Sequence, residues 1–217
     1  MQRRKQKLIE EAPCPVLTDN EREAVCKAAV RLGKAAGYYS AGTVEFLMGS
    51  DRQFYLMEVN TRVQVEHPVT EMITGIDIVQ MQIRVAAGEK LPFSQKQIVP
   101  RGHAIEVRIN AEDPTKGFAP CPGLIEKFES PGGLGVRLDT HAHAGYRIPP
   151  NYDSMIAKLI VHKATREEAI STLRRALHEF RVEPTKTTIP LHQELLRNGN
   201  FLRSEVDIHF VERLLGS

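Results

Sequence analysis

A short stretch of charged, amide and aliphatic residues is the part of this sequence best suited to chemistry. It runs from Glu58 to His67 and follows the apolar residues 54–57. In an extended chain, successive side chains point to opposite faces. One face is then aliphatic, and the other carries the charges and amides of Glu58, Asn60, Arg62, Gln64 and Glu66. Carboxylates, amides and a guanidinium on one face indicate a site for a metal ion and an anion.

A second carboxylate, Glu45, is predicted to lie beside this row. Residues 43–47 are typical of a strand, and residues 49–52 of a turn between antiparallel strands. Pairing centred on this turn places Glu45 opposite Glu58 or one step away, with Cβ atoms roughly 5 Å apart. Both carboxylates can stay ionised there if a cation lies between them, and oxygen ligands including Asn60 suit Mg²⁺ or Mn²⁺. Because Mg²⁺ keeps positions open for phosphates, the expected ligand is a nucleotide. The alternative is an edge strand whose alternating charges discourage pairing with another chain.

The composition is that of an ordinary globular protein and narrows the choice of partners. Hydrophobic residues make up 41% and charged residues 26% of the 217 residues, which argues against disorder. A net charge of +2 favours neither nucleic acid nor membrane as a partner. The three cysteines are far apart, so neither a disulfide framework nor a zinc knuckle is expected, and a reducing cytosol fits. No signal peptide and no apolar run of about 20 residues is present.

The first hundred residues predict helices around the hairpin. Residues 7–12 form an opening segment that Pro13 and Pro15 end, and its abrupt start is typical of a truncated chain. A capping box at residues 18–21 opens a helix that ends at Gly37 and covers one face of the hairpin. A second helical region is expected to start at Thr70 or Thr74 and to end at Gly88. Its buried positions are predicted to be Ile76, Ile78, Val79, Ile83 and Val85.

Pro92 and Pro100 mark the expected domain boundary, after which the apolar period changes to two. An antiparallel sheet is predicted from strands at residues 104–110, 123–128, 135–138 and 155–161. A helix opens at residues 165–168, and two shorter helices follow near residues 189–196 and 208–215. The fold class is therefore α+β.

Three motifs resemble biotin carboxylase, the ATP-grasp component of acetyl-CoA carboxylase and its relatives. They are residues 41–46, 58–72 and 101–114. The resemblance spans essentially the whole chain but only the C-terminal half of the family's enzyme. It implies the C-terminal part of the ATP-grasp domain over residues 1–98 and the biotin carboxylase C-terminal domain over residues 99–217.

The resemblance also implies roles for single residues. Glu45 and Glu58, assisted by Asn60, resemble the ligands of the Mg²⁺ or Mn²⁺ ions that bridge ATP phosphates. Lys7, Arg62, Gln64 and Val65 resemble the bicarbonate site, in which a guanidinium fork and a lysine clamp a small anion.

Four further residues complete the implied site. Glu66 resembles the base that deprotonates bicarbonate for attack on the γ-phosphate of ATP, which gives carboxyphosphate. Arg62 then stabilises the oxygen anion that develops on biotin. Arg108 resembles a residue that contacts biotin and phosphate, although an ion pair with Glu106 or Asp113 is the alternative. Lys5, where the family commonly has histidine, and Leu47 resemble nucleotide contacts.

The implied partners are biotin on a biotin carboxyl carrier protein, carboxyltransferase subunits and a second copy of the chain. Residues 131–137 resemble the homodimer contact, with Leu134 where phenylalanine often stands. Nucleic acid and membrane are not expected partners, and the expected location is the cytoplasm.

Two other functions remain open from the sequence. The chain could be a non-catalytic module that dimerises or meets a carrier protein, since ATP-grasp sites form between two lobes. It could also belong to a related ATP-grasp carboxylase or a carbamoyl-phosphate-forming enzyme, in which case the reaction would not need biotin.

Overall fold

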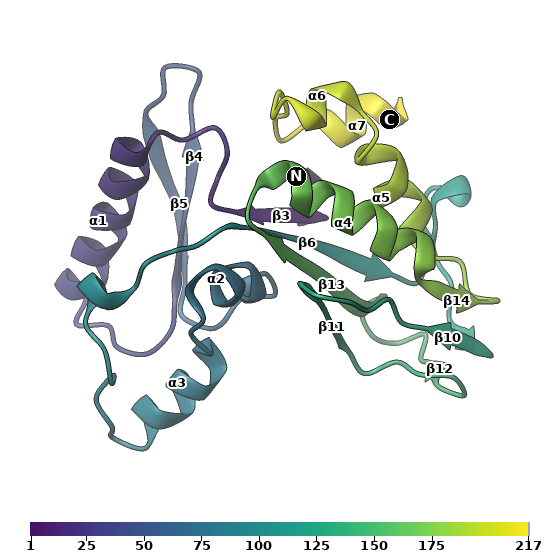
Figure 1. Ribbon diagram of the computed structural model, residues 1–217, viewed down its shortest axis with the longest axis horizontal. Helices are drawn as coiled ribbons and strands as arrows, with labels where there is room; N and C mark the ends of the chain where they lie inside the picture. Colours follow the sequence, from purple (N-terminus) through teal and green to yellow (C-terminus); the bar gives the residue numbers. More distant parts are fainter. Residues whose placement is uncertain (217) are drawn as a thin grey trace. The chain divides into compact units, whose positions relative to one another are not determined.

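The structure, a computed structural model, describes residues 1–216, so only Ser217 lies outside the description. Contacts within the chain define two compact units. Figure 1 shows the chain coloured along the sequence. Residues 14–100 form one unit, and residues 1–13 join residues 101 onward in the other. The division into domains at residues 98 and 99 stays a prediction. In the structure, residues 9–12 pair with a strand at residues 104–107, which places the start of the chain in the unit formed by residue 101 onward.

The unit of residues 14–100 is built around one β-hairpin. Its elements are α1 (Asp19–Ala35), β4 (Thr43–Met48), β5 (Phe54–Asn60), α2 (His67–Thr74), α3 (Ile78–Ala86) and the short 3₁₀ helix η1 (Gln95–Gln97). The capping box that opens α1 is confirmed: the Thr18 hydroxyl accepts from the Glu21 backbone N–H, and the Glu21 carboxylate accepts from the Thr18 backbone N–H at 2.8 Å.

Two sequence predictions for this unit are wrong. The extended run ends at Asn60, and helix α2 begins at His67, because Pro68 stands in the first turn, where its fixed φ favours a helix start. The helical region is two helices, and α3 buries none of its residues: Ile83 is 66% exposed. Helix α1 lies along the hairpin in Figure 1 and is joined to it by the ion pair of Arg52 with Glu21, although none of the α1 residues is buried. Apolar spacing fixes the face of a helix, whereas burial needs a second layer over that face.

A four-stranded antiparallel sheet is the centre of the other unit. Its order is β11 (Val136–Thr140), β13 (Met155–Lys163), β6 (His103–Asn110) and β3 (Ile9–Ala12). The expected opening segment is therefore an edge strand. Pro13 ends β3 but does not prevent its pairing with β6, and Pro is tolerated at such an edge. The short strands β1 (Gln2–Arg3) and β2 (Gln6–Lys7) form a separate hairpin before it.

Smaller elements complete this unit. They are β7 (Glu112–Asp113), η2 (Pro114–Lys116), β8 (Ala119–Pro120), β9 (Gly123–Leu124), β10 (Lys127–Glu129), β12 (Arg147–Ile148), β14 (Arg181–Glu183), α4 (Arg166–Glu179), α5 (Ile189–Leu195), α6 (Gly199–Leu202) and α7 (Phe210–Leu215). The strand predicted over residues 123–128 is broken in two, since β9 pairs with β12 and β10 pairs with β14. Helix α6 was not predicted from the sequence.

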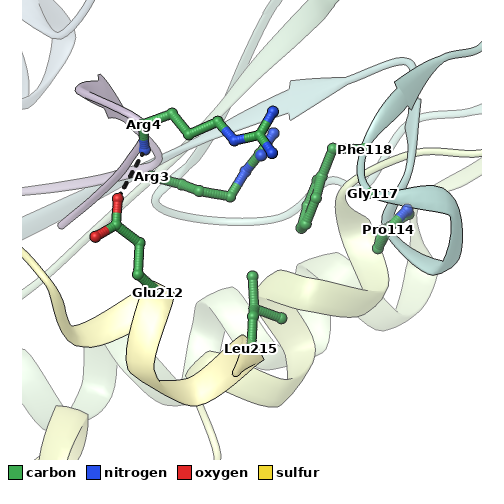
Figure 2. A pocket seen from close by; sticks show the side chains of 7 residues that line it. All are labelled: Arg3, Arg4, Pro114, Gly117, Phe118, Glu212 and Leu215. Atoms are coloured by element: carbon green, nitrogen blue, oxygen red, sulfur yellow. Dashed lines mark hydrogen bonds between the residues drawn. The ribbon is translucent and has the colours of Figure 1, made fainter. Parts of the chain in front are cut away.

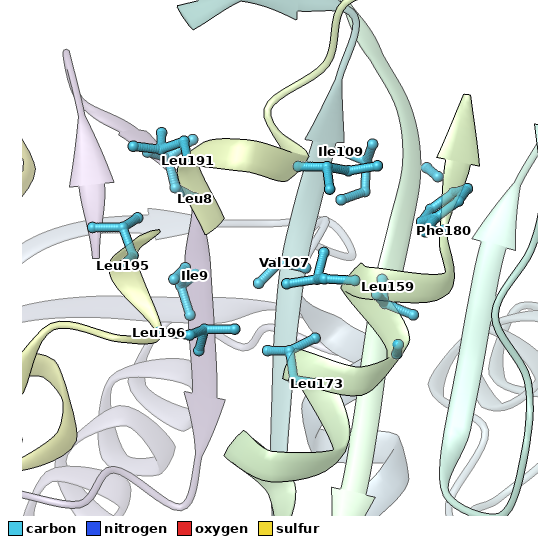
Figure 3. Close-up of a cluster of buried hydrophobic side chains, with 14 of the residues drawn as sticks. Leu8, Ile9, Val107, Ile109, Leu159, Leu173, Phe180, Leu191, Leu195 and Leu196 are labelled. Atoms are coloured by element: carbon cyan, nitrogen blue, oxygen red, sulfur yellow. The ribbon is translucent and has the colours of Figure 1, made fainter. Parts of the chain in front are cut away.

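The hydrophobic core of this unit lies between the sheet and helices α4 and α5, as Figure 3 shows. Val107, Leu159 and Leu173 are fully buried there. Complete burial of one such side chain contributes about 2 kcal/mol to folding. The core therefore gives β6 a rigid setting. Across residues 1–216, no helix is both long enough and apolar enough to cross a membrane.

Candidate functional site

The β4–β5 hairpin brings the two predicted carboxylates together. Glu45 pairs directly with Glu58 in the antiparallel register, which confirms the sequence prediction. The register shifts just beyond this pair, because Phe46 pairs with Leu56 and leaves Met57 as an extra residue on β5. A bulge of this kind bends the strand and re-aims its side chains. The two carboxylates thus lie at an irregular point of the hairpin.

Asn60 links these carboxylates through one amide nitrogen. Its Nδ2 donates to Glu45 Oε1 at 3.1 Å and to Glu58 Oε1 at 2.9 Å. Gln64 Nε2 also donates to Glu45 Oε1. The Arg62 guanidinium donates to Asn60 Oδ1 at 3.1 Å. We call these five residues the hairpin cluster. The cluster holds two carboxylates, two amides and one guanidinium in a single hydrogen-bonded network.

The donor set of the hairpin cluster fits a hard divalent cation. The two carboxylates converge on one point, the Asn60 nitrogen, which marks a place where positive charge is stabilised. In the described part of the chain, no three His, Cys, Asp or Glu side chains are grouped to hold a metal ion. The Asn60 side chain adds an amide oxygen to the two carboxylates as a possible third protein ligand. Oxygen-only ligands are the set that Mg²⁺ and Mn²⁺ prefer.

The residues after β5 approach the cluster by a turn. Gln64 is buried, and its carbonyl oxygen accepts from the His67 backbone N–H at 3.3 Å and contacts His67 Nδ1 at 2.7 Å. Glu66 follows at the N-terminal cap position of α2 with its side chain half-buried, and Val65 is also half-buried. The row of alternating side chains predicted from Glu58 to Glu66 therefore exists only as far as Asn60. Arg62 and Gln64 reach the cluster from the turn.

Three predicted site residues belong to the other compact unit. Lys5 is exposed in the turn between β1 and β2 and has a positive φ of 64°. Lys7 is half-buried on β2, opposite Gln2. Arg108 lies on β6. The remaining nucleotide candidate, Leu47, is 39% exposed on β4 of the hairpin.

Arg108 is held by Glu10 on the neighbouring strand β3. The Arg108 Nε donates to Glu10 Oε1 at 2.8 Å, and Nη2 lies 2.6 Å from the same oxygen. The alternative partners considered from the sequence were Glu106 and Asp113. Glu10 was missed because residues 7–12 were not interpreted as a strand of the sheet. Residues 8–12 show no apolar–polar alternation, so the sequence carried no periodic signal for this strand.

The Arg108 backbone is held by two residues of the α5 region that the sequence did not single out. His192 Nε2 lies 2.7 Å from the Arg108 carbonyl oxygen, and the Thr188 hydroxyl donates to the same oxygen at 3.1 Å. A carbonyl only accepts, so His192 carries its proton on Nε2. Burial is the main cause that lowers the pKa of His192 to about 4, and the hydrogen bond to Arg108 opposes it. His192 is therefore a neutral clamp on β6.

Comparison with known proteins gives two family matches. Residues 1–94 match the ATP-binding domain of the carbamoyl-phosphate synthase L chain, and residues 106–213 match the biotin carboxylase C-terminal domain. A pyruvate carboxylase subunit from Methanothermobacter thermautotrophicus is 56% identical over 98% of this chain and 43% of its own length. Biotin carboxylase of Pseudomonas aeruginosa is 50% identical over 100% of this chain and 48% of its own length. The chain thus spans less than half of these relatives.

Solved structures agree with the sequence matches. The biotin carboxylase domain dimer of Hydrogenobacter thermophilus 2-oxoglutarate carboxylase, in complex with MgADP, ADP and bicarbonate, has a TM-score of 0.96 and 49% identity, covering 98% of this chain and 47% of that one. A biotin carboxylase complex from Campylobacter jejuni has a TM-score of 0.95 and 45% identity, again covering 98% and 47%. The fold and the matches therefore define an α+β protein that combines part of an ATP-grasp domain with a biotin carboxylase C-terminal domain. The chain belongs to the biotin carboxylase family.

Proposed function

We propose that this chain provides the metal, bicarbonate and biotin contacts of an ATP-dependent biotin carboxylase, which carboxylates biotin on a carrier protein through carboxyphosphate. The observation that carries the proposal is the convergence of Glu45 and Glu58 on Asn60, beside Arg62. Family membership supports it, since relatives named biotin carboxylase match the whole chain.

The residues divide the chemistry among them. Glu45, Glu58 and Asn60 hold Mg²⁺ or Mn²⁺, which, when bound, neutralises charge on the ATP phosphates. Arg62 offers a planar fork of donors that matches the oxygens of bicarbonate. Glu66 accepts the bicarbonate proton, so that the bicarbonate oxygen can attack the γ-phosphorus, which releases ADP and gives carboxyphosphate.

Other residues position the reactants. Lys7, Gln64 and Val65 complete the bicarbonate contacts, and Lys5 and Leu47 contact the nucleotide. Arg108 contacts biotin and phosphate and is held for this by its ion pair with Glu10.

We also propose the partners and the location. The carboxyl group leaves on a carrier protein for a carboxyltransferase, in the cytoplasm. A second copy of the chain binds at residues 131–137, and the 90% exposure of Leu134 supports this contact. The ATP-grasp part extends over residues 1–98 and the C-terminal domain over residues 99–217.

Binding of Mn²⁺ tests the metal site without any need for turnover. We expect Glu58→Gln to weaken the affinity for Mn²⁺ by at least about tenfold, because the site loses one of its two charged ligands. The fraction of free Mn²⁺ can be measured by electron paramagnetic resonance. The matched control is Glu89→Gln, which removes an exposed carboxylate paired with Arg84 in the same unit. Equal affinity in the Glu58 variant and the control would remove Glu58 from the site.

Bicarbonate-dependent cleavage of ATP in the presence of free biotin tests the reaction. We expect Glu66→Gln to slow it by about 100-fold or more, which is the range for loss of a general base. The control is Glu23→Gln, an exposed carboxylate on α1. Near-normal turnover in the Glu66 variant would exclude this base. No turnover by the unmodified chain would support the non-catalytic module, and turnover without biotin would support the carbamoyl-phosphate-forming alternative.

A further inference from the structure

A cavity of about 380 Å³ lies within the unit formed by residues 1–13 and 101 onward (Figure 2). Three segments line it: β1 with the turn that follows it, η2 with the loop that follows it, and helix α7. The proposed reaction uses none of the residues that line it. Its volume falls in the range of small-molecule sites, which commonly combine an apolar wall with a few polar groups. The chemistry of its wall therefore indicates what it could bind.

One side of the cavity carries two guanidinium groups. Arg3 and Arg4 both line it, and Figure 2 shows their side chains extending over the same hollow. The Arg3 side chain is only 11% exposed, and its ion pair with Glu112, from Nη2 to Oε2, is long at 3.5 Å. Its Nε is buried and makes no hydrogen bond to any described residue. The long ion pair leaves the charge of the Arg3 guanidinium only partly neutralised.

The guanidinium groups of Arg3 and Arg4 are only partly neutralised by carboxylates, and this favours binding of an anion between them. Burial and then the nearby charge of Arg4 lower the pKa of Arg3, while Glu112 opposes this effect. Glu212 is the carboxylate in the cavity wall, and its oxygens face other groups. They accept from the Arg4 backbone N–H at 3.4 Å and contact His209 Nδ1 at 3.2 Å. Glu212 holds the turn in place, and no described residue forms an ion pair with the Arg4 guanidinium.

The side of the cavity that adjoins Arg3 is apolar. Phe118 presents its ring, with the Arg3 guanidinium carbon 3.6 Å from the ring centroid. Leu215 of α7 and Pro114 complete this side. A guanidinium stacked on a ring is held flat, which suits the planar geometry of a carboxylate. We propose that this cavity binds a small carboxylate with an apolar body, its anionic group on Arg3 and Arg4 and its body between Phe118 and Leu215.

Binding of 2-naphthoate to the whole chain tests this proposal, with the neutral 2-naphthamide and with acetate as comparison ligands. Titrations followed by the NMR signals of the Leu215 methyl groups report directly on the cavity. We expect 2-naphthoate to bind about tenfold more tightly than either comparison ligand, since only it offers both a charge-assisted hydrogen bond and an apolar body.

The variant Arg4→Gln distinguishes a direct contact between Arg4 and 2-naphthoate from general attraction of the anion to the positive charge of the protein. Arg4 is exposed, so its replacement leaves the core intact. We expect Arg4→Gln to weaken 2-naphthoate about tenfold and to leave 2-naphthamide unchanged. The matched control is Arg203→Gln, which removes the same charge from an exposed site in this unit. Equal losses in both variants, no shift of the Leu215 signals, or acetate binding as tightly as 2-naphthoate would each overturn the proposal. None of these outcomes bears on the proposed reaction, because the titration contains neither ATP nor bicarbonate.

Discussion

Replacing His192 with glutamine should remove a defined part of the pH dependence of the free energy of unfolding. The His192 side chain is completely buried, and its Nε2 donates to the Arg108 carbonyl oxygen. Its Nδ1 is buried and makes no hydrogen bond to any described residue. Protonation of Nδ1 would therefore place a charge and an unpaired N–H inside the protein.

The sign and size of the effect follow from the lowered pKa of His192. In the unfolded chain the imidazole binds a proton near its ordinary pKa of 6.5, whereas in the folded protein it does so only near a pKa of about 4. Between these values the unfolded state binds more protons, so the stability that neutral His192 contributes is fully present above pH 6.5 and falls as the pH drops. The whole shift corresponds to about 3 kcal/mol, of which about 2 kcal/mol is lost by pH 5.

Urea unfolding, followed by circular dichroism at several pH values between about 7.5 and 5, measures this contribution. Glutamine stays neutral throughout and still offers an N–H donor. The variant loses stability at every pH through poorer packing, but the difference between it and the unmodified protein should shrink by about 2 kcal/mol as the pH falls. His178→Gln is the matched control, because His178 is an exposed histidine on α4.

A constant difference between the two proteins across this pH range would refute the reasoning. So would an equal change of slope in the His178 variant. In the first case His192 would not be held neutral, and in the second the effect would not depend on burial.

Two further predictions concern stability. Leu173→Ala should lower the free energy of unfolding by about 3 kcal/mol, because Leu173 of α4 is completely buried against the sheet. Urea titration at neutral pH measures this loss, and a loss below about 1 kcal/mol would contradict the prediction. Thr18→Ala should lower the free energy of unfolding by about 1 kcal/mol, because α1 loses its N-terminal cap. Amide hydrogen exchange in the first turn of α1 should become faster, and unchanged exchange there would contradict the role of the capping box.

Local sequence was sufficient wherever neighbouring residues determine the geometry. A short turn between two strands sets the register of a hairpin, so the pairing of Glu45 with Glu58 followed from the chain itself. The cap at Thr18 was predictable for the same reason, since it involves residues three apart. The motif of residues 58–72 likewise indicated the family through its residue types and their order alone.

Contacts between distant segments were decided only by the tertiary structure. Whether residues 9–12 pair as an edge strand depends on β6, about a hundred residues later. That pairing also places Glu10 within ion-pair distance of Arg108. His192 likewise is one more helical residue in the sequence until the fold buries it against the Arg108 carbonyl. Apolar spacing predicted a buried face for α3, but burial needs a covering layer, and Ile83 remains exposed. Spacing along the chain determines which face a side chain takes, whereas its partner and its burial depend on what the rest of the chain brings to that face.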